Sequence, residues 1–250
     1  MTESLLVEWG EHDVLTLTLN RPDRRNALDP ELLLALASAL RREGERAGAV
    51  ILQGAGTSAF SAGYDLGHLT GTEADLDADR LIGGAVEALR HCPAPVIAVL
   101  RGHCHGAGVE LAMNCDLRLA SPDLRMSVPA VSLGVVYRYE FIARLVAACG
   151  LHRTSDLLLG MQELDAPAAY AWGLLTEVVE GTAIAARAHT LASRLALAPR
   201  AAVRGTKASL DLSISRSISA EDAARAQELR VAAASSPERL EALRRRQRKQ

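Results

Sequence analysis

The sequence has few aromatic residues, which make up only 3% of its 250 positions. Because 49% of the residues are hydrophobic, the core must be built from Leu, Val, Ile and Ala side chains. No stretch is apolar over the eighteen or so residues that a membrane helix requires, so we expect no membrane span. The formal net charge of -2 excludes a global attraction to nucleic acid or to an anionic membrane.

Paired cysteine spacings and a targeting segment are also missing. The N-terminal segment MTESLLVEWGEHD has neither the basic start nor the apolar stretch of a signal peptide. In a protein with no export signal, Cys92, Cys104, Cys115 and Cys149 are most simply reduced thiols in the core. We therefore expect a cytoplasmic protein.

The first half of the chain alternates between strand and helix patterns. Residues 14–19 predict a strand, and Asp29 followed by Pro30 predicts the start of a helix. Residues 49–56 and 95–100 predict two buried strands, each running into a glycine-containing turn. This order is typical of an α/β protein, in which ligands bind at the carboxyl ends of strands. The two turns are therefore the first places to look for a site.

The second half of the chain is mostly helical in pattern. After about residue 138 the helical signal is interrupted only by a strand-like segment at residues 174–180. We predict an α/β core over residues 1–198 and a helical C-terminal region over residues 199–250. The basic end, ERLEALRRRQRKQ, is better explained as a solvated helix face than as a nucleic-acid contact. The rest of the chain has no basic or aromatic-rich segment that would extend such a contact.

The run HCHGAGVELAMNCD, residues 103–116, fits neither a metal site nor a dinucleotide-binding turn. In a strand its two histidines would face one way and Cys104 the other, and no further pair completes a zinc site. The third glycine of a dinucleotide-binding turn is replaced by Leu111. Around Ser61 the segment AFSAG lacks the first glycine of a serine-hydrolase elbow. The histidines and cysteines are therefore interpreted as incidental to chemistry.

Backbone chemistry fits this run better. Gly106 and Ala107 lie where a strand ends and a helix begins, and free amides at such a start favour negative charge. The other turn, FSAGYDL, provides Gly63 followed by the amide of Tyr64. Two turns that each direct one N–H at a single oxygen would form an oxyanion hole.

Glu110 follows the second turn by three residues. Helical side chains tilt toward the N-terminus, so the Glu110 carboxylate should lean back over Ala107 and could move a proton beside a bound carbonyl. Alternatively, Glu110 only caps its own helix. Spacing alone leaves both interpretations open.

Three motifs in order resemble the crotonase superfamily, also called the enoyl-CoA hydratase/isomerase family. They are NRPDRRNALDPELL, AFSAGYDLGHL and PVIAVLRGHCHGAGVELAMNCDLRLAS. The resemblance implies an α/β fold with a ββα spiral core, a helical C-terminal trimerisation region, and trimers or dimers of trimers. It also implies an acyl-CoA thioester substrate, with coenzyme A entering as part of that substrate and no separate cofactor or metal.

The resemblance also implies roles for individual residues. The thioester oxygen would be held by the amides of Tyr64 and Ala107 as enolate charge develops. The positions implied to bind substrate are Arg24, Arg25, Ala27, Ala62, Gly63, Asp65, Leu66, Gly106 and Ala130, with Lys249 reaching a neighbouring subunit's nucleotide.

The chain departs from the family pattern at the second acid–base position. Hydratases of this family use two glutamates; Glu110 stands at the first position, but the run SVPAVSLGVV places Ala130 at the second. Methylmalonyl-CoA decarboxylase also lacks that glutamate and has a run similar to LGVVY, with Tyr137 at the tyrosine. We therefore favour decarboxylation of a small malonyl-type CoA thioester, with Tyr137 orienting the carboxylate or thioester. Alternatively, Tyr137 is a partly buried structural tyrosine.

Two other functions stay open. The first is an enoyl-CoA hydratase, isomerase or retro-addition lyase that uses Glu110 as its single acid–base group. The second is a non-catalytic relative that binds acyl-CoA or RNA, for which the C-terminal RRRQRK is the positive support.

Overall fold

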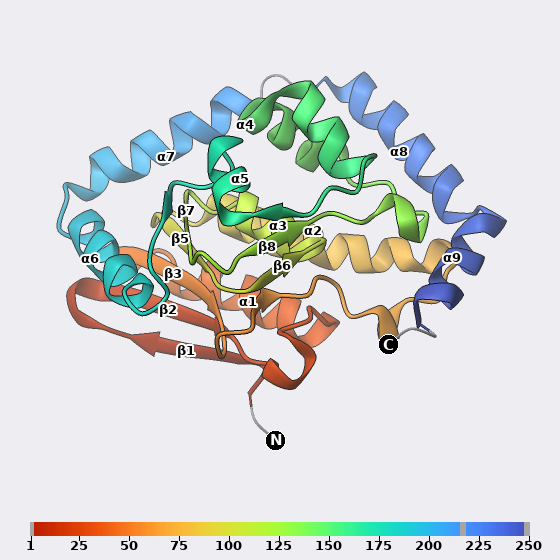
Figure 1. Ribbon diagram of the computed structural model, residues 1–250. Coiled ribbons are helices and arrows are strands. Elements are labelled where there is room, and N and C mark those ends of the chain that lie inside the picture. The colour runs from red at the N-terminus through yellow and green to blue at the C-terminus, as the bar shows by residue number, and fades with distance from the viewer. Residues whose placement is uncertain (1–2, 216–218, 248–250) are drawn as a thin grey trace.

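The computed structural model describes residues 3–215 and 219–247, and it is built on two sheets (Figure 1). The larger, six-stranded sheet has the order β1-β2-β3-β5-β7-β10, antiparallel at β1 and parallel elsewhere. Its strands are β1 (Leu5–Trp9), β2 (Val14–Leu19), β3 (Ala49–Gly54), β5 (Val96–Leu100), β7 (Leu117–Ala120) and β10 (Glu177–Val178). The predicted strands at 14–19, 49–56 and 95–100 are confirmed, whereas the predicted strand at 174–180 shortens to two residues.

A smaller sheet collects the segments that follow the strands of the larger one. Its order is β4-β6-β8-β9, parallel except at β9. The strands are β4 (Ala59–Ser61), β6 (His103–His105), β8 (Arg125–Ser127) and β9 (Leu164–Asp165). Because β3, β5 and β7 lead into β4, β6 and β8, and a helix follows each pair, the chain repeats a ββα unit. This confirms the expected spiral core.

Nine α-helices lie in the described residues and surround the sheets. They are α1 (Pro30–Glu43), α2 (Leu76–His91), α3 (Ala107–Met113), α4 (Tyr139–Leu158), α5 (Ala166–Ala171), α6 (Ile184–Ala196), α7 (Arg200–Ser215), α8 (Ala220–Ala234) and α9 (Pro237–Gln247). Helix α1 begins as predicted, because the Asp29 carboxylate accepts a hydrogen bond from the amide of Leu32 at 2.8 Å. In this part of the chain no helix is long and apolar enough to cross a membrane.

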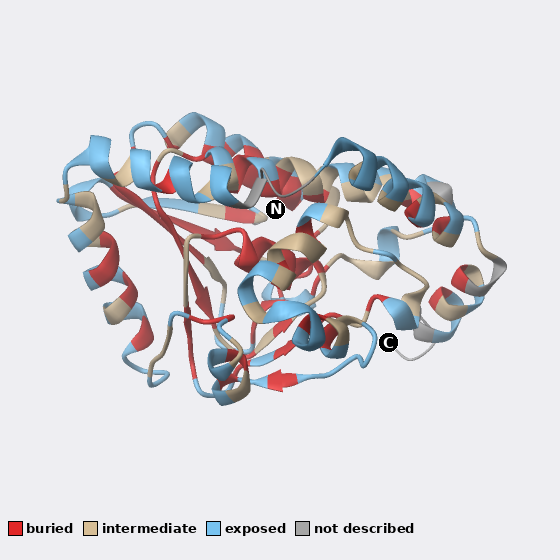
Figure 2. Cartoon of the chain, turned by 90° about the horizontal axis from the view of Figure 1, so that it is seen from above, coloured by how far each residue is buried: buried red, intermediate tan, exposed pale blue. Residues whose placement is uncertain are grey.

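The larger sheet is covered on both faces, as parallel sheets require. On one face its leucines pack with α1 and α2 into the main core, and on the other its Val and Ile side chains pack against α6. Figure 2 shows the resulting buried interior with exposed residues on the outer faces of the helices. All six residues of β2 are buried for this reason. Alternate side chains of VLTLTL therefore point to opposite faces of the sheet that are both buried, and neither face is exposed to solvent.

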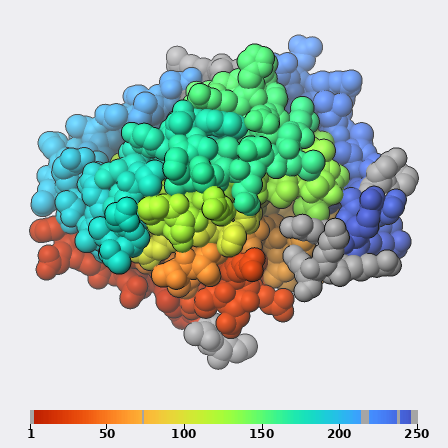
Figure 3. Space-filling view, in the orientation of Figure 1, coloured from red at the N-terminus to blue at the C-terminus, as the bar shows by residue number. Residues whose placement is uncertain are grey.

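The C-terminal helices lie against the core rather than apart from it. In Figure 3 the described residues from α6 onward occupy the two flanks of the visible face, and the red residues near the start of the chain lie along its lower edge. Arg230 on α8 pairs with Asp79 on α2, and Arg239 on α9 pairs with Asp75 at 2.7 Å. These contacts join the predicted region 199–250 to the predicted core 1–198.

The pair between Asp75 and Arg239 is buried, with side-chain exposures of 3% and 6%. The Asp75 carboxylate also accepts hydrogen bonds from the amides of Thr70 at 2.7 Å and Gly71 at 2.9 Å. Burial acts to raise the pKa of Asp75, but these donors and Arg239 outweigh it and lower the pKa. The carboxylate is therefore ionised in the folded protein at neutral pH.

Replacing Asp75 by Asn should reduce the free energy of unfolding by about 3 kcal/mol, because Arg239 would be left buried without a counter-charge. Because the folded-state pKa is lowered, the loss should be complete above the ordinary value of 3.8 and should decline as the pH falls from 3.8 through the lower folded-state pKa. Urea unfolding at pH 7 and at pH 3 measures the loss in the free energy of unfolding and its dependence on pH. The control is Asp77→Asn, which breaks an exposed pair with Arg80 and should cost less than about 1 kcal/mol. Equal losses for the two variants would contradict the prediction.

Candidate functional site

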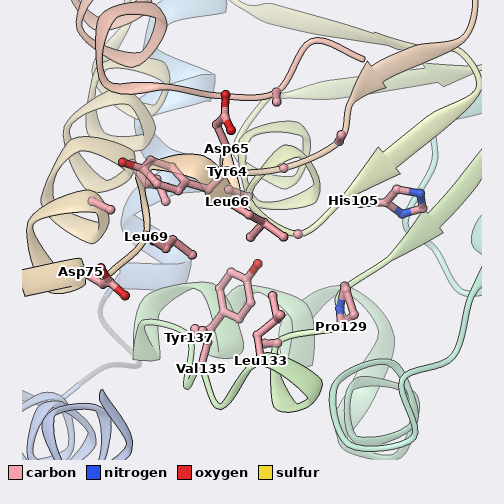
Figure 4. Close-up of a pocket in the computed structure, with 18 of the residues that line it drawn as sticks. Tyr64, Asp65, Leu66, Leu69, Asp75, His105, Pro129, Leu133, Val135 and Tyr137 are labelled. Carbon is pink, nitrogen blue, oxygen red and sulfur yellow. The ribbon is translucent and has the colours of Figure 1, made fainter. Parts of the chain in front are cut away.

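One cavity of about 790 Å³ lies where the two glycine-containing turns meet. Its wall also includes residues of α2, of the segment 129–137 and of α8 and α9. Figure 4 shows Tyr64, Leu66 and Leu69 on one side, Leu133 and Tyr137 facing them, and His105 at one end. The two glycine-containing turns therefore line one cavity, and each follows a short strand of the smaller sheet, β4 or β6, rather than the predicted strands themselves.

The structure places most of the predicted site residues on this wall. Those that line the cavity are Arg24, Arg25, Ala27, Ala62, Gly63, Tyr64, Asp65, Leu66, Gly106, Ala107, Ala130 and Tyr137. Glu110 is not among the lining residues, and Lys249 lies outside the described residues. The positions implied by the resemblance therefore mark the cavity, but the Glu110 carboxylate does not line it.

The two turns approach each other as closely as glycine allows. Gly63 has a φ of +92°, and a Cβ there would lie 2.8 Å from the carbonyl oxygen of His105 and 3.5 Å from the amide nitrogen of Ala107. Gly106 also has a positive φ, +55°. Within residues 3–215 and 219–247, neither the amide of Tyr64 nor that of Ala107 donates a hydrogen bond to the protein. Two unused donors thus stand side by side at the cavity.

A buried asparagine holds the first turn in place. The Asn26 side chain, fully buried, donates to the carbonyl oxygens of Ala55 at 3.0 Å and Ala59 at 2.8 Å. The same segment pairs with the turn, because the amide of Ala62 donates to the carbonyl of Arg25 at 2.9 Å. Asn26 gives no local signal in the sequence, because its partners lie about thirty residues farther along the chain.

Glu110 is buried behind the cavity wall, with 2% exposure, and its carboxylate forms an ion pair with Arg138. Burial raises the pKa of Glu110, and the charge of Arg138 opposes that shift. The carboxylate is held by Arg138 at the start of α4, and its action on a proton beside a bound carbonyl stays a prediction. The capping alternative does not describe it, since the bond is to another element.

Arg138 could not be identified from the sequence, where YRYEFIARL replaces the family's glycine-rich stretch. Its guanidinium packs against α2 so tightly that a Cβ on Gly83 would lie 2.6 Å from Nη1. A glycine at that point of α2 therefore makes room for the cation that faces Glu110.

Tyr137 faces the cavity beside the oxyanion turn. Its hydroxyl oxygen lies 3.3 Å from where a Cβ of Gly106 would stand, and its ring packs on Phe141 with centroids 5.0 Å apart. Burial raises the pKa of Tyr137 well above its ordinary value, and the negative charge of Glu110 adds to that shift. Ala130 lines the same wall with 6% exposure, so a methyl group occupies the second acid–base position.

The histidines of HCHGAGVELAMNCD also line the cavity. His103 Nδ1 lies 3.1 Å from His105 Nε2, and His105 Nδ1 lies 2.8 Å from the hydroxyl of Ser127. Strand pairing explains the cluster, since His105 stands opposite Ser127 in β8. Cys104 points the other way and is fully buried, as predicted, and burial raises the pKa of its thiol. No group of three or more metal-ligating side chains occurs in the described residues.

Comparisons with known proteins agree with this geometry. The family model described as enoyl-CoA hydratase/isomerase matches residues 10–245. The probable enoyl-CoA hydratase echA6 of Mycobacterium tuberculosis is 39% identical over 166 residues, covering 66% of this chain and 67% of that protein. The 1,2-epoxyphenylacetyl-CoA isomerase of Escherichia coli is 32% identical over 197 residues, covering 76% and 75%.

A solved structure shows the same arrangement. An enoyl-CoA hydratase/carnithine racemase from Magnetospirillum magneticum superposes with a TM-score of 0.81 at 32% identity, covering 90% of this chain and 86% of that one. These relatives carry hydratase and isomerase names, so the preference for decarboxylation receives no support from them. Since the family model spans nearly the whole chain and the fold and its turns agree with it, the chain belongs to the enoyl-CoA hydratase/isomerase family of the crotonase superfamily.

Proposed function

We propose that this protein is an acyl-CoA isomerase, which holds a thioester enolate between the amides of Tyr64 and Ala107 and uses Glu110 as its single acid–base group. The observation that carries the proposal is the pair of unused amides in one cavity, with the Glu110 carboxyl group buried behind its wall and a methyl group at Ala130. Losing one such donor costs about 3 kcal/mol of transition-state stabilisation.

A single carboxyl group suits isomerisation better than hydration. In an isomerisation the base removes a proton from one carbon, the thioester oxygen takes up the charge, and the same group returns the proton to another carbon. Addition of water across a double bond requires one group to activate the water and another to protonate carbon. Ala130 has no group for the second task, and the reaction proposed needs no cofactor beyond the coenzyme A of the substrate.

Tyr137 connects Glu110 to the substrate in this proposal. The carboxylate does not line the cavity, but the Tyr137 hydroxyl does, and it lies both beside Gly106 and within the electrostatic influence of Glu110. The proton therefore passes between Glu110 and the substrate carbon through this hydroxyl. Arg138 stabilises the ionised form of Glu110 while the proton is bound to the substrate carbon.

The rest of the cavity suits the two ends of an acyl-CoA. Arg24 and Arg25 are exposed cations on one wall and would meet the phosphates of coenzyme A. Leu66, Leu69 and Leu133 provide apolar surface for the acyl group. The acyl chain would thus enter between the turn after Tyr64 and the segment before Tyr137.

The proposed isomerase should convert a β,γ-unsaturated acyl-CoA into its conjugated isomer, which is followed by the absorbance of the conjugated thioester. Glu110→Gln removes the proton acceptor and should lower kcat at least about a hundredfold. Glu87→Gln, on the exposed side of α2, is the matched control and should leave kcat unchanged. Release of CO2 from methylmalonyl-CoA without any isomerisation would instead establish decarboxylation, and binding of acyl-CoA without turnover would establish a non-catalytic relative.

The pH dependence should report the environment of Glu110. Its carboxylate must be ionised to accept a proton, and its pKa is raised, so kcat/KM should fall with decreasing pH at a point above the ordinary value of 4.5. Arg138→Met removes the opposing cation, so the pKa rises further and the acid limb should move to higher pH. Arg144→Met, which breaks a pair with Asp211, is the control. An acid limb that does not move in Arg138→Met would contradict this role.

The region 199–250 is proposed to assemble the protein into trimers or dimers of trimers. Helix α7 exposes Leu210 and Leu212 by 61% and 54%, which is apolar surface available for a neighbouring subunit. Sedimentation equilibrium should show a multiple of three chains for the wild type and a smaller species for the double variant Leu210→Asp, Leu212→Asp. A monomeric wild type would contradict the assembly.

A further inference from the structure

We infer that the cavity holds a second, hydrolytic centre, in which the Ser127 hydroxyl attacks the carbonyl carbon of a CoA thioester with His105 as its base. This centre acts on the same thioester as the proposed function and therefore rests on that proposal for substrate binding. It makes no use of Glu110 or Tyr137.

The three side chains are spaced as an activated nucleophile requires. Ser127 Oγ lies 2.8 Å from His105 Nδ1, so the hydroxyl can donate to that nitrogen. The other nitrogen of the ring, Nε2, then carries the hydrogen and donates to His103 Nδ1 at 3.1 Å. His103 thereby orients the ring of His105 in one tautomer and supports the imidazolium that forms when it takes the serine proton.

Strand pairing holds this cluster rigidly on one face of the smaller sheet. In the parallel pair of β6 and β8, His105 stands opposite Ser127, and His103 lies two residues before His105 on the same face. Cys104 and Met126 point to the opposite face and are fully buried in the core. Ser127 itself is 9% exposed, so its hydroxyl is largely removed from bulk water.

The nucleophile also lies next to the oxyanion hole. The carbonyl oxygen of Ser127 accepts a hydrogen bond from the amide of Gly106 at 2.9 Å, and the next residue is Ala107. Ser127, His105 and His103 all line the cavity, together with Tyr64 and Ala107. A thioester whose oxygen lies between the two amides would therefore have its carbonyl carbon close to this strand.

The reaction has two balanced steps, with water as the second substrate. Ser127 Oγ bonds to the carbonyl carbon while its proton passes to His105; the C–S bond then breaks, and the proton leaves with the thiolate as free coenzyme A. In the second step His105 takes a proton from water, the resulting hydroxide displaces Ser127 from the acyl group, and His105 returns the proton to the serine. The products are a carboxylic acid and coenzyme A.

Saturated acyl-CoA esters test this centre separately from the isomerase, because they have no double bond to move. The wild-type protein should release coenzyme A from butyryl-CoA and octanoyl-CoA, detected with a thiol reagent. Ser127→Ala and His105→Leu should each lower the rate at least about a hundredfold. Ser209→Ala, an exposed serine on α7, is the control for the serine change.

His103 is a positioning residue, so its test compares two substitutions. His103→Asn keeps an acceptor near the position of Nδ1 and should retain more release of coenzyme A than His103→Leu, which has no acceptor. Equal rates for the two variants would remove His103 from the centre.

Covalent trapping makes the outcome independent of how well the variants fold. Mass spectrometry of wild-type protein quenched during turnover should find the acyl group on the peptide that contains Ser127. Undiminished release by Ser127→Ala, or no release and no acyl-peptide, would overturn the hydrolytic centre. Isomerisation without release would overturn this centre alone, whereas release without isomerisation would overturn only the proposed isomerase.

Discussion

The close approach of two backbone turns is the constraint on which the rest of the site depends. At Gly63 a Cβ would meet the carbonyl oxygen of His105 at 2.8 Å, and at Gly108 it would meet the Cβ of Ser61 at 2.9 Å. Only glycine fits at these contacts without moving backbone or buried side chains. Because the contacts hold, the amides of Tyr64 and Ala107 come to one place, and every chemistry considered for this cavity uses them.

Charge is the second constraint, since three ion pairs lie in the cavity wall or behind it. Glu110 with Arg138, Asp79 with Arg230 and Asp75 with Arg239 form three pairs, and each partner of a pair comes from a different part of the chain. An unpaired ion at such a depth would be costly, so the pairs hold α4, α8 and α9 in register with the core. The same pairing holds the Glu110 carboxylate behind the cavity wall, which Tyr137 lines.

Local signals predicted the elements and the position of the cavity. The Asp29–Pro30 start of α1, the buried strands at 49–54 and 96–100, and the glycine turns after them all follow from rules that act over a few residues. The two turns follow neighbouring parallel strands, β4 and β6, so they lie at one edge of the smaller sheet and line one cavity. The strand predicted at 174–180 was too long, because only two of its residues find a partner, in β7.

The sequence by itself thus determined the α/β order of strands and helices and the two glycine-containing turns, because each depends on residue type and short spacing. The ββα repeat and the second acid–base position at Ala130 followed from the resemblance to the family. Tertiary structure alone decided which side chains meet in the cavity. Arg138 pairs with Glu110 across 28 residues, Ser127 meets His105 across 22, and Arg239 reaches Asp75 across 164. Such partners are chosen by strand register and helix packing, and those long-range contacts leave no periodic signal along the chain.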